Sequence, residues 1–201
     1  MNWSTNINEI GKCLQAMSAT LGNTSNITVD EAFGKWTDLT VHIRTQKNTV
    51  FLIGNGASAS MASHVAADLA KNAHLHTEVF TDLALITAIA NDVSYDEVFA
   101  EPLRRRLKKG DMLVAISSSG QSRNILQAVA TAKKLGGIVI ALSAMKAENP
   151  LRHEGDLNLY VPAQTYGMAE TCHAAILHYW IDRTILTNQV KHPLNPLFQR
   201  G

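Results

Sequence analysis

The sequence predicts an α/β fold in which helices cover both faces of a parallel sheet. The predicted strands are continuous apolar runs, which is typical of parallel strands buried on both faces. Helical patterns separate these runs along the chain, as α/β topology requires. Two of the runs also break into small-residue loops that lead directly into a helix. Such loops gather at the carboxyl edge of a parallel sheet, where α/β proteins bind their ligands.

The individual elements follow from apolar spacing and from glycine and proline positions. Strands are predicted at residues 49–53, 76–80, 111–116, 138–142 and 157–161. Helices are predicted at residues 7–21, 29–45, 58–73, 95–107, 124–135 and 167–186, with a further apolar run at residues 82–90. Because Pro193 and Pro196 cannot continue the last helix, we expect a single domain over residues 1–187 and a C-terminal tail over residues 188–201.

Composition and charge are those of an ordinary globular protein. The 201 residues are 46% apolar and 17% charged, with a formal net charge of +1. That length provides one sizeable core but not two. The one dense basic tract, Arg104-Arg105-Arg106 with Lys108 and Lys109, is typical of the solvated C-terminal end of a helix, where cations are favoured. We therefore expect no nucleic-acid partner.

The cysteines and the first residues predict a cytoplasmic protein. Cys13 and Cys172 lie far apart in sequence and match no metal-finger spacing, so we expect reduced thiols. The opening residues, MNWSTN, have neither the basic flank nor the apolar run of a secretion signal. No stretch is apolar enough to span a bilayer. The expectation is a soluble protein with no membrane partner.

The predicted strand at residues 49–53 ends in the loop Gly54-Asn-Gly-Ala-Ser-Ala-Ser60, ahead of a helix. Backbone N–H groups and the positive end of the helix then point at one place, which suits an anion. The pattern is not the dinucleotide G-x-G-x-x-G, because Gly54 and Gly56 are followed by Ala59, and no Gly-Lys pair makes it a Walker loop. From these residues alone, a binding loop and an ordinary strand-to-helix turn are equally good interpretations.

A second loop of this kind, Ser117-Ser-Ser-Gly-Gln-Ser122, is a stronger candidate for binding phosphate. Its four serines offer more hydroxyl groups than helix capping needs, and Gly120 gives the backbone freedom to turn toward an anion. Arg123 is the only adjacent cation, so neutral donors would hold the anion, which favours a sugar phosphate over a nucleotide triphosphate. Both loops follow strands and should open at the same edge of the sheet.

Titratable side chains suited to metal binding or proton transfer occur in two groups. His64 and Asp68 share one face of the helix after the glycine loop; such a pair can bind a metal, act as acid and base, or simply lie in solvent. Glu170, His173 and His178 form the second group, on the last helix. Glu170 and His178 are about 12 Å apart along the helix axis. A shared ion would therefore have to lie between two extended side chains, or take a ligand from another subunit.

Together these motifs resemble those of the sugar isomerase (SIS) domain family, and most closely those of the phosphoheptose isomerases. The match covers roughly residues 30–187, in the family's order and spacing. The matching pieces are Gly54-Asn-Gly-Ala-Ser58, His64 with an acid at position 68, Ala88-Ile-Ala-Asn-Asp92, Ser117-Ser-Ser-Gly-Gln-Ser122 and the histidine-bearing last helix. The resemblance implies a flavodoxin-like fold, with a five-stranded parallel sheet between helices. It also implies that N-terminal helices support a homotetramer whose active sites are shared between subunits.

The resemblance further implies an activity in heptose biosynthesis, the interconversion of sedoheptulose 7-phosphate and D-glycero-D-manno-heptose 7-phosphate through an enediol. Asp68 and His178 would pass the protons. Zinc, or another divalent metal, would be bound by His64, Asp68, Glu170 and His178. The residues that would line the sugar phosphate are Asn55, Gly56, Ala57, Asn91, Asp92, Ser117, Ser118, Ser119, Ser122 and Glu170.

At three positions the chain departs from the family pattern. Asp68 stands where the family usually has glutamate, Glu170 where it has glutamine, and Ala57 where it has the second glycine of a pair. Together the three departures are compatible with an isomerase acting on a different sugar phosphate, with a different metal or with weakened activity. A separate alternative is a non-catalytic SIS adaptor that binds the replication initiator, since such adaptors look very like this enzyme. The retained His64, carboxylate at position 68 and His178 favour an enzyme, because an adaptor has no need of that set.

Overall fold

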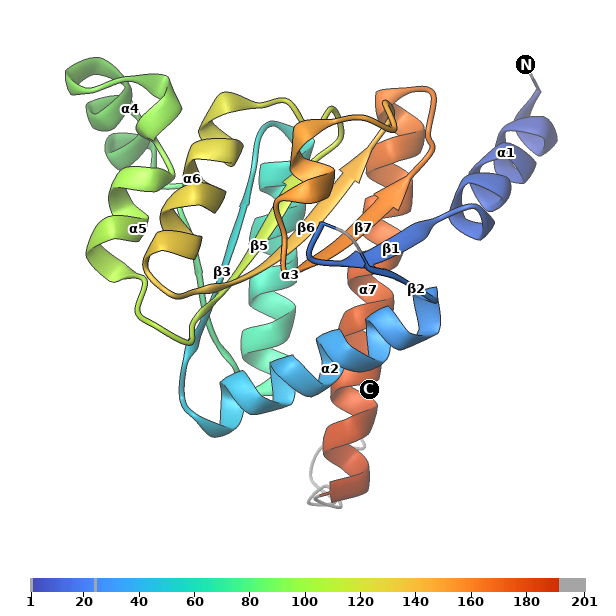
Figure 1. Cartoon of the computed structure of the whole chain (residues 1–201), viewed down its shortest axis with the longest axis horizontal. Coiled ribbons are helices and arrows are strands. Elements are labelled where there is room, and N and C mark those ends of the chain that lie inside the picture. Colours follow the sequence, from blue (N-terminus) through green and yellow to red (C-terminus); the bar gives the residue numbers. More distant parts are fainter. Residues whose placement is uncertain (1, 24, 192–201) are drawn as a thin grey trace.

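The computed structural model describes residues 2–23 and 25–191, and its centre is a seven-stranded sheet (Figure 1). The strands lie side by side in the order β2-β1-β7-β6-β5-β3-β4. Their bounds are β1 Ser18–Leu21, β2 Ser25–Ile27, β3 Thr49–Gly54, β4 His76–Val79, β5 Met112–Ser117, β6 Ile138–Ala144 and β7 Leu157–Val161. All five predicted strands are present, and the α/β class is confirmed.

Two further strands make the sheet mixed, so the prediction of a purely parallel, five-stranded sheet is wrong. β7, β6, β5, β3 and β4 are parallel, but β1 pairs antiparallel with both β7 and β2. β1 uses residues that the apolar pattern assigned to the first helix. That helix, α1 (Trp3–Gln15), ends earlier, and the chain then forms a hairpin through Gly22, whose φ is +55°. Pairing with the distant β7 is a tertiary contact, which overrides the local helical pattern.

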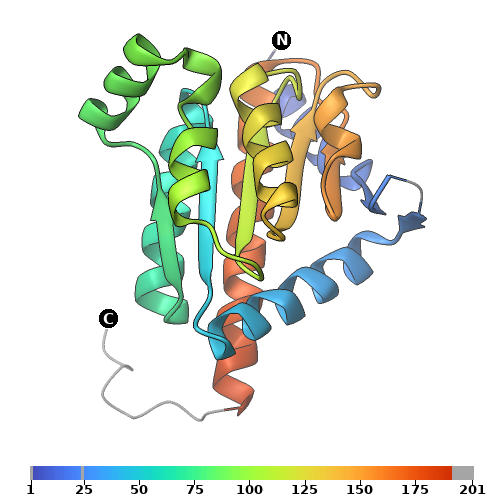
Figure 2. The same cartoon turned by 60° about the vertical axis from the view of Figure 1, so that its left-hand side comes forward.

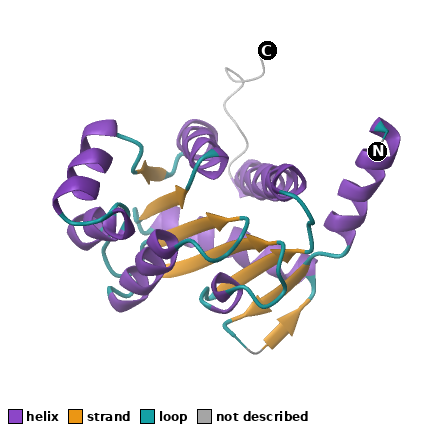
Figure 3. Ribbon diagram, turned by 90° about the horizontal axis from the view of Figure 1, so that it is seen from above, coloured by secondary structure: helices purple, strands orange, loops and turns teal. Residues whose placement is uncertain are grey.

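Helices cover both faces of the sheet (Figures 2 and 3). One buried apolar cluster joins the sheet to α2, α3 and α7, and a second joins it to α5 and α6. The strands supply both clusters: Leu52 of β3 belongs to the first and its neighbour Phe51 to the second. This two-sided burial is why the strand sequences are apolar without alternation. The remaining helix bounds are α2 Val29–Thr45, α3 Ala57–Ala73, α4 Leu83–Asp92, η1 Tyr95–Glu97, α5 Ala100–Arg106, α6 Arg123–Lys134, η2 Pro150–His153 and α7 Tyr166–Lys191.

The helix predicted over residues 95–107 is interrupted. Its first part is the short 3-10 helix η1, and α5 begins only at Ala100. Pro102 lies in the first turn of α5, where its missing N–H is tolerated. A continuous helix would place this proline in a helix interior, where it removes a hydrogen bond and clashes with the preceding turn.

The long helix α7 packs beside α3 and α2. Candidate site residues lie on both α3 and α7, so this packing sets their relative positions. Trp180 of α7 stacks on Trp36 of α2, with ring centroids 4.1 Å apart. The Trp180 Nε1 also donates a hydrogen bond to the Thr40 hydroxyl, at 2.9 Å. Both indole rings are fully buried, so the stack fixes the position of α7 within the core.

The C-terminal part of the chain is helical for longer than predicted. α7 runs to Lys191 rather than ending at residue 186. Of the predicted tail, residues 192–201 lie outside the described residues, and the domain boundary at residue 187 stays a prediction. None of the helices in the described ranges combines the length and the apolar character needed to cross a membrane.

Candidate active site

The two predicted binding loops lie side by side at the carboxyl edge of the sheet. β3 and β5 are adjacent parallel strands, with Gly54 paired to Ile116, so the loops that follow them leave the sheet together. Each loop leads into the amino end of a helix, α3 or α6. Both helices therefore direct unpaired backbone N–H groups toward this edge. The predicted co-location of the loops is confirmed.

The glycine turn at residues 54–56 is required by the close approach of α3. A Cβ on Gly54 would lie 2.6 Å from the Ser58 backbone, and Gly56 has a φ of +55°. Gly56 is also the N-cap of α3 and makes no side-chain hydrogen bond to the helix. The Ser58, Ala59 and Ser60 N–H groups bond to the carbonyls of Asn55 and Gly56, so at this turn the positive end of the α3 dipole, more than free N–H groups, favours an anion.

A pocket of about 220 Å³ lies between the two loops and is termed the serine pocket. Its lining residues are Asn55, Ser58, Ile116, Ser117, Ser118, Ser119, Ser122, Tyr166 and Glu170. Ser117 and Ser118 are buried, and the Ser122 hydroxyl lies 3.4 Å from that of Ser117. Ser122 is the N-cap of α6, yet its side chain caps no backbone N–H. Helix capping therefore does not explain this serine, whereas an anion in the pocket would.

The serine loop is braced from outside by Asn149, a residue that the sequence did not point to. Gly120 has a φ of +63°, and a Cβ there would lie 1.9 Å from Asn149 Oδ1. The Gly120 carbonyl accepts a hydrogen bond from the Leu151 N–H, at 3.1 Å. Asn149 is itself fully buried and donates to the Lys146 carbonyl at 2.8 Å. The loop is thus held in one shape before any ligand arrives.

The cation next to the serine loop does not enter the pocket. The Arg123 side chain is 84% exposed and pairs with Asp96 of η1, with 3.1 Å between Nη2 and Oδ2. It is absent from the residues that line the serine pocket. The donors available to an anion here are therefore hydroxyls and backbone N–H groups, as the sequence predicted.

A second group of polar residues, termed the histidine cluster, consists of His64 and Asp68 of α3 and His178 of α7. His64 Nε2 lies 3.3 Å from Asp68 Oδ2, and the His64 and His178 ring centroids are 5.2 Å apart. One ligand atom from each of the three residues lies within 4.8 Å of the others. Two imidazole nitrogens and a carboxylate oxygen are a donor set that suits zinc. Glu170 is not in this group, because it lies in the serine pocket.

Comparison with known proteins identifies the family. A family model described as SIS domain matches residues 14–144. The chain belongs to the SIS-domain family. A relative, the phosphoheptose isomerase of Shewanella sp. (strain W3-18-1), is 32% identical over 166 residues, which cover 77% of this chain and 84% of that protein. The phosphoheptose isomerase of Campylobacter concisus (strain 13826) is 36% identical over 135 residues, 64% of this chain and 71% of that one.

Solved structures agree with the SIS-domain assignment. The structure of the phosphoheptose isomerase from Neisseria gonorrhoeae has a TM-score of 0.77 to this chain, at 28% sequence identity. The similarity covers 90% of this chain and 96% of that one. The family predicted from the loop motifs is therefore confirmed.

The SIS-domain motif residues on α4 lie apart from the serine pocket. Asn91 and Asp92 are exposed at the C-terminal end of α4 and bond to each other, with 2.8 Å between Asn91 Nδ2 and Asp92 Oδ1. Ala57 is exposed at the start of α3. Gly56 lines a neighbouring pocket of about 270 Å³, which also includes Asn55. Within one chain, the serine pocket thus gathers the four serines, Asn55 and Glu170, but not the other predicted sugar-lining residues.

The structure distinguishes the two histidines of α7 that the sequence left open. His173 is fully buried, and within the described part of the chain neither ring nitrogen has a partner in good hydrogen-bond geometry. Burial lowers the pKa of His173 to about 4, and the Ser143 backbone opposes this shift only in part. His178 is exposed and joins the histidine cluster. The two residues are five apart, which places them on different faces of the helix.

Proposed function

We propose that this SIS-domain chain is a sugar-phosphate isomerase that interconverts sedoheptulose 7-phosphate and D-glycero-D-manno-heptose 7-phosphate. The proposal rests on one observation: helix α7 contributes a residue to each of the two candidate regions. This helix reaches the serine pocket through Glu170 and, two turns later, contributes His178 to the histidine cluster. A pocket suited to phosphate and a cluster suited to proton transfer thus share one rigid element. The substrate follows from the names of the relatives.

In this proposal the serine loop holds the phosphate. The hydroxyls of Ser117, Ser118, Ser119 and Ser122 donate to phosphate oxygens, and the amino end of α6 supplies backbone N–H groups and its positive dipole. Because Arg123 is paired with Asp96, no cation is needed from this loop. The residues proposed to line the rest of the sugar are Asn55, Gly56, Ala57, Asn91, Asp92 and Glu170.

The histidine cluster would carry the proton transfers. An aldose–ketose exchange moves a proton between adjacent carbons, so we assign the Asp68 carboxylate as the base that removes it from one carbon and returns it to the next. The imidazole of His178 would move the proton between the two sugar oxygens. Zinc or another divalent metal, held by His64, Asp68 and His178 with Glu170 as the predicted fourth ligand, supplies a Lewis acid for the carbonyl oxygen when bound.

Incubation of the purified protein with sedoheptulose 7-phosphate tests the proposal directly. Formation of aldose phosphate is followed by NMR, with and without a chelator, on protein whose metal content has been measured. We expect turnover that the chelator abolishes. Absence of turnover by metal-loaded protein would reject the proposed reaction, and turnover of another sugar phosphate in the same assay would replace the substrate.

The same assay separates the enzyme from a non-catalytic adaptor. An adaptor would bind the replication initiator without turning over any sugar phosphate. We favour the enzyme, because the histidine cluster is assembled from two helices and an adaptor has no use for it. Capture of the initiator by an inactive preparation would reverse this preference.

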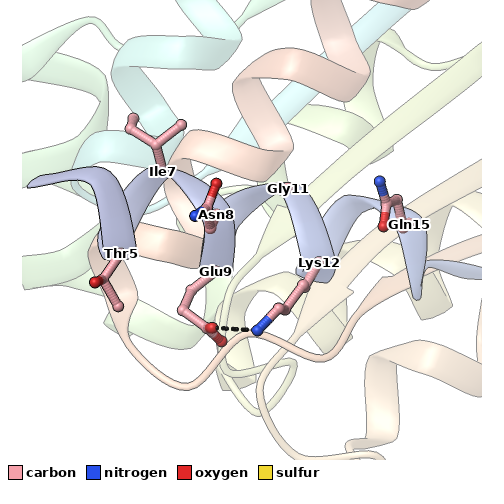
Figure 4. A pocket seen from close by; sticks show the side chains of 7 residues that line it. All are labelled: Thr5, Ile7, Asn8, Glu9, Gly11, Lys12 and Gln15. Carbon is pink, nitrogen blue, oxygen red and sulfur yellow. Dashed lines mark hydrogen bonds and ion pairs between the residues drawn. The ribbon is translucent and has the colours of Figure 1, made fainter.

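Self-association as a homotetramer is part of the proposal and is supported by exposed apolar residues on two helices. α1 extends away from the body of the molecule (Figure 1) and leaves Trp3 76% exposed. A hollow of about 570 Å³ runs along this helix, lined by Thr5, Ile7, Asn8, Glu9, Gly11, Lys12 and Gln15 (Figure 4). On α4, Leu83 is 74% exposed. A second copy would remove this apolar surface from water. Analytical ultracentrifugation tests the oligomeric state.

A cytoplasmic location is likewise proposed. Both cysteines, Cys13 and Cys172, are free and buried, which suits a reducing compartment. Fractionation of the source cells is the corresponding measurement.

A further inference from the structure

We infer that Asn124 and Tyr95 fix the orientation of the Asn55 amide, so that Asn55 can offer the substrate a hydrogen-bond donor but no acceptor. The inference concerns the serine pocket and rests on the proposed function. Asn55 lines this pocket, whereas neither Asn124 nor Tyr95 is among its lining residues. Tyr95 lines the neighbouring pocket together with Gly56, but both Tyr95 and Asn124 bond to the Asn55 amide, so we assign them as positioning residues that determine what Asn55 presents.

Asn55 and Asn124 form a reciprocal amide pair across the two loops. Asn55 Nδ2 donates to Asn124 Oδ1 at 3.0 Å, and Asn124 Nδ2 donates to Asn55 Oδ1 at 2.9 Å. Asn124 lies in the first turn of α6 and is 2% exposed. The pair therefore ties the glycine turn to the start of the helix that follows the serine loop.

A backbone group sets the direction of this pair. The Ile125 N–H donates to Asn124 Oδ1 at 3.0 Å, and a backbone N–H cannot act as an acceptor. The Asn124 atom that faces it must therefore be the oxygen. With that oxygen fixed, the Asn55 atom opposite must be the nitrogen, because two oxygens would repel. The orientation of the Asn55 amide thus follows from the Ile125 N–H, a group that can only donate.

The Tyr95 hydroxyl occupies the remaining hydrogen-bond acceptor site of the Asn55 amide oxygen. The Tyr95 hydroxyl, in η1, lies 3.2 Å from Asn55 Oδ1 and donates to it. An amide oxygen has two lone-pair sites, and here Asn124 and Tyr95 occupy both. The amide nitrogen has two hydrogens, of which Asn124 uses one. Asn55 therefore retains one N–H and no lone pair for a ligand.

This leaves a clear chemical requirement for the ligand. The group that meets Asn55 must be an oxygen that accepts, such as a carbonyl oxygen, a hydroxyl acting as acceptor or a developing enediolate oxygen. A donor-only group at the same place would find no partner. The fixed donor also needs no reorientation during the reaction, which is the condition under which hydrogen bonds stabilise developing charge most effectively.

The test compares kcat and KM for sedoheptulose 7-phosphate in the wild type, N124D and Y95F. The carboxylate introduced by N124D would retain the shape of the side chain and the bond from Ile125, but it would place an oxygen against Asn55 Oδ1. We expect kcat/KM to fall at least tenfold in N124D and two- to fivefold in Y95F. A loss confined to KM would identify a sugar oxygen bound equally in the ground and transition states, and a loss in kcat would identify an oxygen that gains charge.

Two matched variants separate positioning from simple destabilisation. N158D makes the same change at another asparagine that is 2% exposed, whose amide bonds to Thr20, Gly22 and Gly155 instead. Y160F removes a phenol donor that bonds to the Met145 carbonyl. Thermal unfolding is measured for all four. Equal fractional losses of kcat/KM in N124D and N158D, or unchanged kinetics in Y95F, would overturn the inference. Inactivity of the wild type would instead overturn the proposed function, so the two failures are distinguishable.

Discussion

The serine pocket and the histidine cluster differ in how the fold builds them. The pocket is formed by two loops at the ends of adjacent strands, and two of its serines are buried. The histidine cluster is formed by side chains on the outer faces of α3 and α7, where the His64 side chain is 59% exposed. Backbone shape therefore defines the pocket, whereas helix packing defines the cluster. We therefore expect substitutions in the serine pocket to leave the histidine cluster unaffected, and the reverse.

The largest effect is expected at the cluster. Asp68→Asn removes the proposed base without changing the size of the side chain, and it should lower kcat about 10²- to 10⁴-fold. Because asparagine has nearly the same size and shape as the aspartate it replaces, the melting temperature should change little. Phosphate affinity, measured by titration calorimetry, should stay as in the wild type. Asp38→Asn, on an exposed position of α2, is the matched control. Unchanged turnover in Asp68→Asn would contradict the proposed role.

The pocket should respond to a change of backbone. Gly120→Ala combines a positive φ with a Cβ that would collide with Asn149, so we expect about 2–4 kcal/mol less stability and weakened phosphate binding. Metal content should be unaffected. Gly167→Ala is the control, since a Cβ there meets nothing within 4 Å. Equal stability of the two variants in urea unfolding would refute the bracing of the serine loop.

A third prediction concerns the buried His173 of α7 and depends on pH. The pKa of His173 is lowered by burial from 6.5 to about 4, so the unfolded chain binds a proton in this range that the folded chain does not. Stability should be complete above pH 6.5 and fall as the pH is lowered toward 4, by at most about 3 kcal/mol from this group. His173→Phe should flatten this part of the pH profile of urea unfolding, while His76→Gln, at an exposed position, should not. Parallel profiles for the wild type and His173→Phe would disprove the assignment.

The smallest effect is expected for single hydroxyls of the pocket. Ser122→Ala removes one donor of several, so the loss should be about 1 kcal/mol, or roughly fivefold in KM. The rate constant kcat should be retained, because the phosphate is remote from the reacting carbons. Ser60→Ala, on α3 outside the serine pocket, serves as control. A loss in kcat alone would indicate that the pocket and the cluster are not independent.

Much of the fold was predictable because its signals are local. Apolar runs such as residues 112–116 mark the five parallel strands, and the small-residue loops that follow β3 and β5 mark the candidate binding edge. β1 was not predictable, because Ser18–Leu21 becomes a strand by pairing with β2 and with the distant β7. The break between η1 and α5 had a visible signal in Pro102.

The candidate site likewise has features that the sequence predicts and features that it does not. The four serines are close together in sequence, so their gathering in one pocket could be predicted. The contacts of Asn124 with Asn55 and of Asn149 with Gly120 depend on tertiary structure, and no pattern of residue spacing in the sequence indicates them. The choice between His173 and His178 was also hidden, because α7 has apolar residues on most of its faces and its sequence does not reveal which face is covered.

The ends of the sheet have a consequence for solubility and assembly. The outer strands are β2, of three residues, and β4, of four, and Glu78 of β4 carries a charge that pairs with Arg106. Short, charged edges give foreign strands little backbone on which to pair. The sheet therefore resists growth into fibrils, and we expect copies of this chain to associate through their helices.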